Sequence, residues 1–210
     1  MKKLGNLLSG YLKFRQKYVE DEKTLMHELH TQGQSPQVMV VSCCDSRVDP
    51  ALILQCDPGD LFVVRNIANI VPPYETDSAH HGTSAALEFG IKSLQVKHLI
   101  IMAHSECGGI KAWVENKKSC DAAKNAKEGF LDNWLSIIDV PDYQNLEVND
   151  CAKFALKNSY NNCLSFPWIK EKLDNKLLEI HLWFFDIKSG NIQMYSWQEN
   201  KFTDLVCDLN

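Results

Sequence analysis

Apolar residues recur at helical spacing at the very start of the chain. They occupy positions i, i+3, i+4, i+7 and i+8, which are Leu4, Leu7, Leu8, Tyr11 and Leu12. This spacing predicts an amphipathic helix. A second helical pattern covers about residues 20–29 and stops before Gly33-Gln34-Ser35-Pro36, which contains two helix breakers. We therefore expect residues 1–33 to form an N-terminal helical arm.

Three later segments show a different pattern, a short and uninterrupted apolar run. They are Val38-Met39-Val40-Val41, Leu61-Phe62-Val63-Val64 and Leu99-Ile100-Ile101-Met102. Continuous runs of this length are typical of strands that are buried on both faces, as in a parallel sheet. A helical pattern at about residues 76–94 lies between the second and third runs. Another helical pattern follows the third run and begins at Gly108-Gly109. Strands that alternate with helices predict an α/β fold.

The second half of the chain is mostly helical from residue 122 to 172, with breaks at Pro141 and Pro167. Residues 178–187 and 192–197 then favour two strands around the turn Ser189-Gly190-Asn191, which indicates a hairpin at a sheet edge. We expect a mostly parallel central sheet of about four parallel strands plus one antiparallel edge strand, flanked by helices. The chain contains no repeat or linker, so residues 1–210 are expected to form one domain.

Composition adds limits rather than a function. The apolar fraction of 45% and the charged fraction of 23% are ordinary for a globular protein. The net charge of -5 and the lack of a basic stretch argue against nucleic acid as a partner. No apolar run approaches a signal peptide or a membrane span, so we expect a cytoplasmic protein. In such a compartment the eight cysteines are expected to be reduced rather than paired.

The chemistry of the chain is concentrated in two short segments, Cys43-Cys44-Asp45-Ser46-Arg47 and His104-Ser105-Glu106-Cys107. Each follows one of the buried strands, and sites in open α/β sheets form beyond the carboxyl ends of the strands. Two thiolates and an imidazole are a ligand set that suits zinc. Structural zinc sites use four such ligands, whereas this set has three and a neighbouring Asp–Arg pair. The pattern therefore indicates an open zinc site, as in a hydrolase or hydratase.

The charge of the ligands determines how easily a water bound to such a zinc loses its proton. Two thiolates cancel the charge of Zn²⁺, so a bound water is a weaker acid than on a zinc with three histidines. Asp45 can accept a hydrogen bond from that water, and Arg47 can keep Asp45 ionised and oriented. Without that pairing Asp45 can itself bind the metal and close the site. Neighbouring strand residues point to opposite faces, so only one of Cys43 and Cys44 can face the metal.

Several motifs together resemble the β-class carbonic anhydrases, in particular the plant-like, non-allosteric branch. Two of them resemble the family's zinc signatures, namely Ser42-Cys43-Cys44-Asp45-Ser46-Arg47-Val48 and Ala103-His104-Ser105-Glu106-Cys107-Gly108-Gly109-Ile110. Others resemble its central block and its flanks: Phe62-Val63-Val64-Arg65-Asn66-Ile67-Ala68-Asn69, Val71-Pro72-Pro73-Tyr74, Gly33-Gln34-Ser35-Pro36 and Ser165-Phe166-Pro167-Trp168-Ile169. The motifs follow the family's order and extend over nearly the whole chain.

The resemblance implies one zinc ion per chain and reversible hydration of CO₂ to bicarbonate and a proton by zinc-bound hydroxide. It implies that Cys43, His104 and Cys107 hold the zinc, and that Asp45 and Arg47 form the catalytic pair, with Asp45 on the metal only if the site is closed. It also implies a homodimer or a dimer of dimers.

The resemblance further implies a set of substrate-binding residues. Gln34 matches an amide that reaches in from the partner subunit, Phe62 matches an apolar wall of the CO₂ pocket, and Gly108 matches a backbone position beside the substrate. Phe89 stands where the plant-like pattern has Tyr, so one hydrogen-bond donor is missing from that wall. His80 and His81 are candidates for a proton shuttle, or else a surface pair before a helix.

Other functions and one regulatory question stay open at this point. The same fold can hydrolyse a CO₂ analogue such as carbon disulfide, and a non-catalytic module can bind zinc or bicarbonate. A thiol redox protein lacks support because the chain has no Cys-x-x-Cys. In the bicarbonate-inhibited branch a Trp and a Gly stand where this chain has Val40 and Ser42. Since Arg65 occurs in both branches, it does not separate them, and we expect an open, non-allosteric site.

Overall fold

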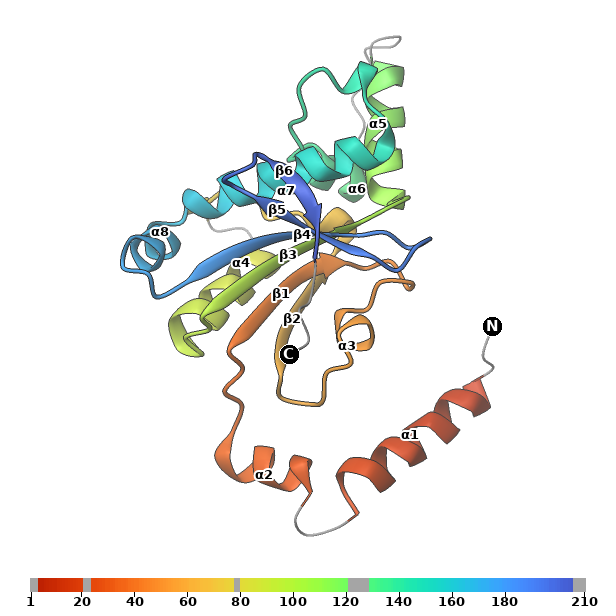
Figure 1. Cartoon of the computed structure of the whole chain (residues 1–210), viewed down its shortest axis with the longest axis vertical. Coiled ribbons are helices and arrows are strands. Elements are labelled where there is room, and N and C mark those ends of the chain that lie inside the picture. The colour runs from red at the N-terminus through yellow and green to blue at the C-terminus, as the bar shows by residue number, and fades with distance from the viewer. Residues whose placement is uncertain (1–3, 21–23, 78–79, 121–128, 206–210) are drawn as a thin grey trace.

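A six-stranded sheet with the order β2-β1-β3-β4-β5-β6 forms the centre of the molecule (Figure 1). The computed structural model describes residues 4–20, 24–77, 80–120 and 129–205. The strands are β1 (Val38–Cys43), β2 (Leu61–Asn66), β3 (His98–His104), β4 (Glu179–Phe185), β5 (Ile192–Ser196) and β6 (Lys201–Asp204). The order reverses between β1 and β3, because the chain passes from β1 to one neighbour and then crosses to the other.

The α/β fold with a mostly parallel sheet is confirmed. Strands β2, β1, β3 and β4 run parallel, while β5 and β6 are antiparallel to their neighbours. The expected hairpin is β4–β5, but β5 is not the edge of the sheet because β6 pairs with it. The sequence did not reveal β6, since Lys201-Phe202-Thr203-Asp204 has one apolar residue and charged ends. Such composition is common on edge strands, where it prevents further pairing.

Helices and short helical turns connect the strands. Their bounds are α1 (Leu4–Tyr18), α2 (Leu25–Gln32), α3 (Pro50–Ile53), η1 (Ile67–Asn69), α4 (Gly82–Glu88), η2 (Phe89–Ser93), α5 (Gly108–Cys120), α6 (Phe130–Leu135), η3 (Tyr143–Asn145), α7 (Val148–Leu164) and α8 (Pro167–Asp174). The helix predicted for residues 76–94 begins only at Gly82, because Thr76 to Gly82 is polar and offers no apolar face. Residues 78–79 of that prediction, 1–3 and 21–23 of the arm, and 122–128 of the later helical pattern lie outside the described residues.

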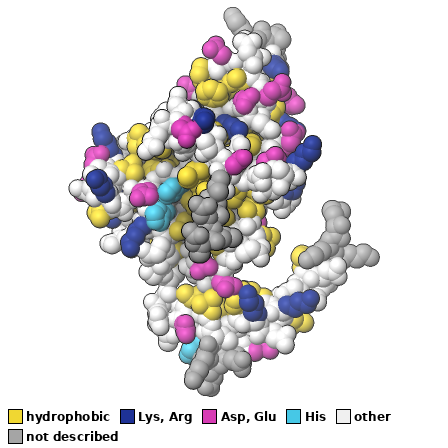
Figure 2. Space-filling model, viewed as in Figure 1, with side chains coloured by type: hydrophobic (Ala, Val, Ile, Leu, Met, Phe, Trp, Pro, Cys, Tyr) yellow, Lys and Arg dark blue, Asp and Glu magenta, His cyan; other side chains and the backbone are white. Residues whose placement is uncertain are grey.

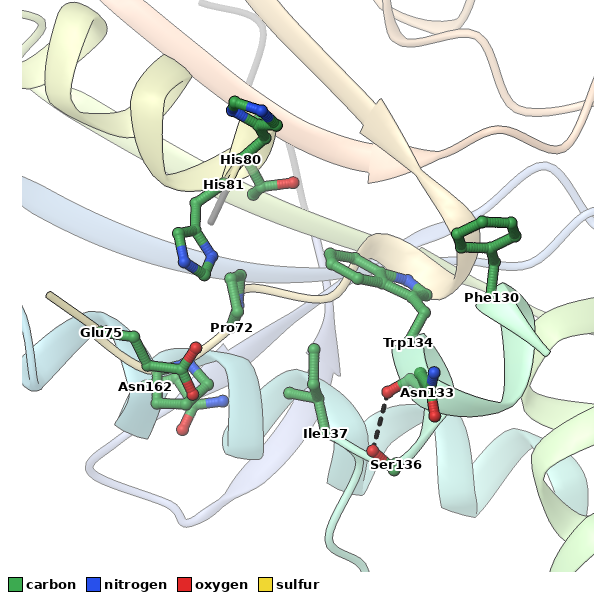
Figure 3. A pocket seen from close by; sticks show the side chains of 13 residues that line it. Pro72, Glu75, His80, His81, Phe130, Asn133, Trp134, Ser136, Ile137 and Asn162 are labelled. Carbon is green, nitrogen blue, oxygen red and sulfur yellow. Dashed lines mark hydrogen bonds between the residues drawn. The ribbon is translucent and has the colours of Figure 1, made fainter. Parts of the chain in front are cut away.

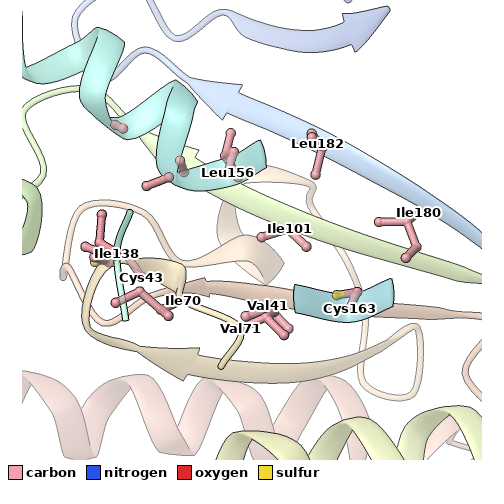
Figure 4. Close-up of a cluster of buried hydrophobic side chains, with 14 of the residues drawn as sticks. Val41, Cys43, Ile70, Val71, Ile101, Ile138, Leu156, Cys163, Ile180 and Leu182 are labelled. Atoms are coloured by element: carbon pink, nitrogen blue, oxygen red, sulfur yellow. The ribbon is translucent and has the colours of Figure 1, made fainter. Parts of the chain in front are cut away.

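Strands β1 and β3 bury both of their faces, as their uninterrupted apolar runs predicted. The same prediction for Leu61–Val64 is wrong, because β2 is the edge of the sheet and none of its residues is fully buried. Val41 and Ile101 point into the larger core cluster, to which helices α4, α5, α7 and α8 contribute (Figure 4). Val40 and Ile100 alternate with them and belong to a smaller cluster on the opposite face. The alternation follows from the period of two along a strand. This packing fixes the positions at which β1 and β3 end.

The N-terminal arm contributes little to this core. None of the described side chains of α1 or α2 is buried, and Leu4 remains 73% exposed. Helix α1 extends away from the sheet (Figure 1). At its end, Lys17 forms an ion pair with Asp57 at 3.1 Å. The apolar side of the first helix is therefore uncovered within a single chain. Among the described helices there is none with the length and apolar character needed to cross a membrane.

Candidate metal centre

Cys43 and His104 lie side by side because they end two neighbouring parallel strands. Ser42 of β1 pairs with Met102 of β3, so the next residues of both strands leave the sheet at the same edge. The strand order reverses at this position, and binding sites in open α/β sheets form there. Cys107 follows in the turn that leads into α5. The sequence prediction that two distant segments meet at one sheet edge is thus confirmed.

The three side chains form a compact and buried cluster. The Sγ atoms of Cys43 and Cys107 are 3.9 Å apart. One ligand atom from each of Cys43, His104 and Cys107 lies within 4.8 Å of the others. The exposed fractions of the three residues are 4%, 1% and 1%. Three soft donor atoms that converge in a buried place fit a zinc ion.

The orientation of His104 supports this fit independently. Its Nδ1 lies 2.9 Å from the carbonyl oxygen of Ser105, to which the Nδ1–H group donates. The lone pair is then on Nε2, which is buried and has no hydrogen-bond partner among the described residues. A buried polar atom without a partner is costly, and a metal ion would satisfy it. Histidine ligands in zinc sites are commonly fixed in this way through the other ring nitrogen.

Ionisation of one of the two cysteine thiols makes ionisation of the other less favourable. A hydrogen bond from the Cys107 thiol lowers the pKa of Cys43 to about 4. The same hydrogen bond, together with burial, raises the pKa of Cys107 far above that of an ordinary thiol. The pKa shifts have opposite signs because two buried thiolates this close repel each other. A divalent cation between them would remove that repulsion and allow both to ionise.

Cys44, the rival ligand that sequence spacing left open, points elsewhere. It is exposed, whereas Cys43 is buried in the cluster. Burial of part of its side chain and the neighbouring Cys43 raise the pKa of its thiol. The geometry therefore favours Cys43 as the ligand.

Asp45 and Arg47 form a bidentate ion pair beside the cluster. Nε of Arg47 donates to Oδ1 at 2.9 Å and Nη2 donates to Oδ2 at 2.6 Å. The backbone N–H of Arg47 also donates to Oδ1 at 2.9 Å. These hydrogen bonds hold the pKa of the Asp45 carboxyl well below its usual range. Oδ2 lies 3.9 Å from Nε2 of His104, so the carboxylate stands next to the metal-binding atoms.

Arg65 supports the loop that carries Cys43 and Asp45. Its guanidinium donates to the carbonyl oxygens of Cys43 at 2.9 Å and of Asp45 at 2.8 Å, and it pairs with Asp49 at 2.6 Å. Asp49 in turn caps α3 by accepting from the backbone N–H of Ala51. Sequence analysis missed this role, because it considered Arg65 only as a marker between family branches.

A second supporting set holds the turn between His104 and Cys107. The hydroxyl of Ser105 donates to Asp186 at 3.1 Å and accepts from the backbone N–H of Ile187 at 2.9 Å. Glu106 has the left-handed φ of 56°, and the side chain of Asn149 accepts from its backbone N–H at 3.0 Å. The turn is thus tied to β4 and α7. The sequence analysis did not predict these contacts. The one sequence feature that pointed to Ser105 and Glu106 was their position between the candidate ligands His104 and Cys107.

An open cavity of about 310 Å³ adjoins the cluster. It is lined by Cys43, Cys44, Asp45, Ile67, Gly108, Gly109, Ala112 and Leu131. Of the four predicted substrate-binding residues, Gly108 is in this lining. Phe62 and Phe89 lie farther along the sheet, where their rings pack at 5.8 Å, and Gln34 is exposed before β1. Within one chain the structure therefore brings Gly108 to the site and places the other three elsewhere.

His80 and His81 line a different and larger cavity of about 580 Å³ (Figure 3). Nε2 of His81 lies 2.6 Å from Asp77, and this hydrogen bond raises the pKa of His81. Trp134 lines the same cavity and donates from Nε1 to the carbonyl oxygen of Ile67 at 2.8 Å. Since Ile67 lines the cavity at the cluster, this hydrogen bond links the linings of the two cavities.

The chain is similar to several known proteins. The family model described as carbonic anhydrase matches residues 38–192. β-Carbonic anhydrase 3 of Arabidopsis thaliana is 34% identical over 197 residues, which are 89% of this chain and 74% of the relative. The solved β-carbonic anhydrase CcaA has a TM-score of 0.81 and 30% identity, with 99% of this chain and 94% of that chain covered. One of two tetrameric β-carbonic anhydrases from Sordaria macrospora has a TM-score of 0.65 and 28% identity over 97% of this chain and 93% of that chain.

Proposed function

The chain belongs to the β-class carbonic anhydrases, and on that basis we propose that it hydrates CO₂ reversibly at a zinc ion held by Cys43, His104 and Cys107. The observation that carries the proposal is the unpartnered, buried Nε2 of His104, which converges with two sulfur atoms beside Asp45. When bound, zinc lowers the pKa of a coordinated water, so that this water can attack CO₂ near neutral pH.

Asp45 orients the attacking water and receives its hydrogen bond. Its carboxylate is acceptor-only when ionised, and the ion pair with Arg47 keeps it in that state. The pair also restrains Asp45, since both carboxylate oxygens are occupied by Arg47. Asp45 is therefore held close to the metal-binding atoms without being one of them. This arrangement supports an open site.

The cavity beside the cluster suits a small apolar substrate. Ile67, Ala112 and Leu131 provide apolar surface opposite Cys43, and CO₂ carries no net charge that would require a counter-ion. Gly108 begins α5 in the same lining, so its backbone is accessible to the substrate and to bicarbonate. The site can thus admit CO₂ and release an anion through its open side.

Phe62, Phe89 and Gln34 would act on a neighbouring subunit in this proposal. Phe62 pairs with Met39 near the start of β1, whereas Cys43 is at its end. Four residues of parallel strand separate them by about 13 Å, so Phe62 cannot form a wall of the cavity in its own chain. We therefore propose a homo-oligomer in which the uncovered side of α1 packs on a second copy. The tetrameric relatives from Sordaria macrospora support an oligomeric state of this kind.

Proton transfer to solvent is assigned to His80 or His81. Both line the larger cavity, whose Trp134 bonds to Ile67 of the cavity at the cluster, and histidine is a common proton carrier. The ring of His81 is held by a hydrogen bond to Asp77. A cytoplasmic location remains a prediction from the sequence.

The test of the proposal is the rate of CO₂ hydration by protein whose metal content has been measured. Asp45→Asn is expected to retain zinc and to lose about 100-fold or more in turnover, as removal of a positioned proton acceptor does. The amide keeps the shape of the side chain but loses its charge. Glu88→Gln, on the exposed surface of α4, is the matched control. Near-normal turnover in zinc-replete Asp45→Asn, or hydrolysis of carbon disulfide without CO₂ hydration, would contradict the mechanism.

A further inference from the structure

A second cluster of potential metal ligands lies at the opposite end of the sheet. It consists of His98 at the start of β3 and of Glu179 and His181 on β4. One ligand atom from each lies within 4.8 Å of the others. His98 and His104 are six residues apart on the same strand, so about 20 Å of sheet separates this cluster from the catalytic centre.

The strand register explains why these three side chains meet. His98 pairs with Glu179, and Ile100 pairs with His181. Since side chains alternate between the two faces of a strand, residues 98 and 100 of β3 share a face, and so do residues 179 and 181 of β4. The three side chains therefore project from two adjacent strands onto the same side of the sheet. Figure 2 shows histidine side chains gathered beside acidic ones on one face of the molecule.

The distances between the ligand atoms match those around a tetrahedral metal ion. Nδ1 of His98 and Nε2 of His181 are 3.1 Å apart. Oε2 of Glu179 lies 3.7 Å from the first nitrogen and 3.8 Å from the second. Metal–ligand bonds of about 2.0–2.2 Å at tetrahedral angles place ligand atoms roughly 3.4 Å apart. A small adjustment of the Glu179 side chain would bring all three atoms onto one ion.

The surroundings favour a cation that imidazole can bind. Burial and the neighbouring His98 lower the pKa of His181, which favours the neutral ring that a metal binds. Glu179 adds a negative charge. The side chains of His98 and His181 are 41% and 26% exposed, so an ion can enter from solvent and complete its shell with water. Two imidazoles and one carboxylate suit zinc and other late first-row divalent cations rather than Mg²⁺ or Ca²⁺.

We propose that His98, Glu179 and His181 form a second site for a divalent transition-metal ion, separate from the catalytic centre. A bound ion would join the starts of β3 and β4. Strand β3 ends at His104, and β4 is followed by Asp186, which binds Ser105. The site holds the ion with nitrogen and oxygen ligands only. This ligand set distinguishes it spectroscopically from the cysteine-containing centre.

The test begins with protein that contains one zinc per chain, to which further Zn²⁺ is added in a calorimeter. We expect a second, weaker binding event and a rise in the melting temperature. His98→Ala and His181→Ala should lose this event while retaining the first zinc, and Glu179→Gln should weaken it. Glu179→Gln also serves as the variant least able to disturb folding, because its side chain is 67% exposed.

Two controls locate the ion. His30→Ala changes an exposed histidine of α2, and His81→Ala disrupts the rival cluster of Glu75, Asp77 and His81. Both should bind the second zinc as the original chain does. Co²⁺ added to the zinc-loaded protein should give tetrahedral absorption bands without the sulfur charge-transfer band of a thiolate site. Absence of a second event, its persistence in His98→Ala and His181→Ala, or its loss in His81→Ala would overturn the proposal.

Discussion

At the scale of single residues, the metal centre depends on which atoms are left without a partner. Nε2 of His104 is buried and has no hydrogen-bond partner among the described residues, while Nδ1 is bound to the carbonyl oxygen of Ser105. Two sulfur atoms whose thiol pKa values shift in opposite directions stand beside it. Each of these features is costly without a cation, and together they specify one position for it.

The ligand assignment predicts a contrast between adjacent residues of the sequence. Cys107→Ala should lose most of its zinc, because it removes one of three converging donors. Cys44→Ser should keep its zinc, because that side chain is exposed and lies outside the cluster. Metal content per chain, measured by mass spectrometry on folded protein, checks both. Full zinc in Cys107→Ala, or none in Cys44→Ser, would reverse the assignment.

At the scale of elements, the start of α5 must approach η1 closely. A Cβ atom added at Gly109 would lie 2.7 Å from Cγ2 of Ile67 and 3.0 Å from Cβ of Ala68. Gly108, one residue earlier, has no other atom within 4 Å of an added Cβ. The close contact fixes Cys107 and the cavity lining relative to η1.

This contact predicts different stabilities for two neighbouring alanine substitutions. Gly109→Ala should reduce the free energy of unfolding by about 1–3 kcal/mol, because the extra methyl group overpacks the contact with η1. Gly108→Ala should change stability by much less, since its methyl group enters open space. Chemical denaturation of both variants provides the comparison. Equal stability losses would show that α5 tolerates a shift away from η1.

At the scale of the whole molecule, the arm has an apolar side that none of the described residues of the same chain buries. Leu8 and Leu12 are 59% and 61% exposed. Deletion of residues 1–18 should therefore give aggregates or an inactive monomer, since the proposed subunit contact and the residues it positions would be lost. Size-exclusion chromatography with light scattering, combined with activity, tests this expectation.

A milder change separates the subunit contact from folding. Leu8→Asp with Leu12→Asp should shift the protein toward monomer, because two charges would enter the contact. Asn6→Asp, on the other side of the same helix, should leave the oligomer intact. A stable and fully active monomer in the double variant would rule out this contact.

Regulation by bicarbonate is also a property of the whole site. Val40 and Ser42 are fully buried in the sheet, and Arg65 is engaged with Cys43, Asp45 and Asp49. Val40 carries no side-chain donor, the guanidinium of Arg65 is already engaged, and the Ser42 hydroxyl, which has no hydrogen-bond partner among the described residues, is shut off from solvent. We expect activity to fall gradually as the pH falls and the attacking water regains its proton, without cooperative inhibition by bicarbonate.

The pH range of this loss, rather than its sign, separates Asp45 from the attacking water as its cause. Its carboxyl has a pKa well below the usual range, so it stays ionised until the pH falls below that value. The pH–rate profile with and without added bicarbonate gives the result. A steep, multi-proton loss of activity that bicarbonate deepens would show that the enzyme is allosteric.

The sequence by itself determined the α/β class, the mostly parallel sheet with its buried strands β1 and β3, and the two segments that carry the candidate metal ligands. It did so because burial on both faces leaves an unbroken apolar run, and because ligand chemistry is a property of residue type. Only the tertiary structure shows that Cys43, and not Cys44, lies in the cluster with His104 and Cys107, since the direction of a side chain depends on how the strand is placed in the sheet.

The structure also supplied the contacts that join segments far apart in the chain. Arg65 under the Cys43 loop, Asp186 behind Ser105, and the meeting of His98 with His181 all depend on strand order and register. Strand β6 forms because it pairs with β5, and its own composition does not predict it. Local patterns do not encode such contacts, because each one requires two distant segments to be fixed by the packing of the same core.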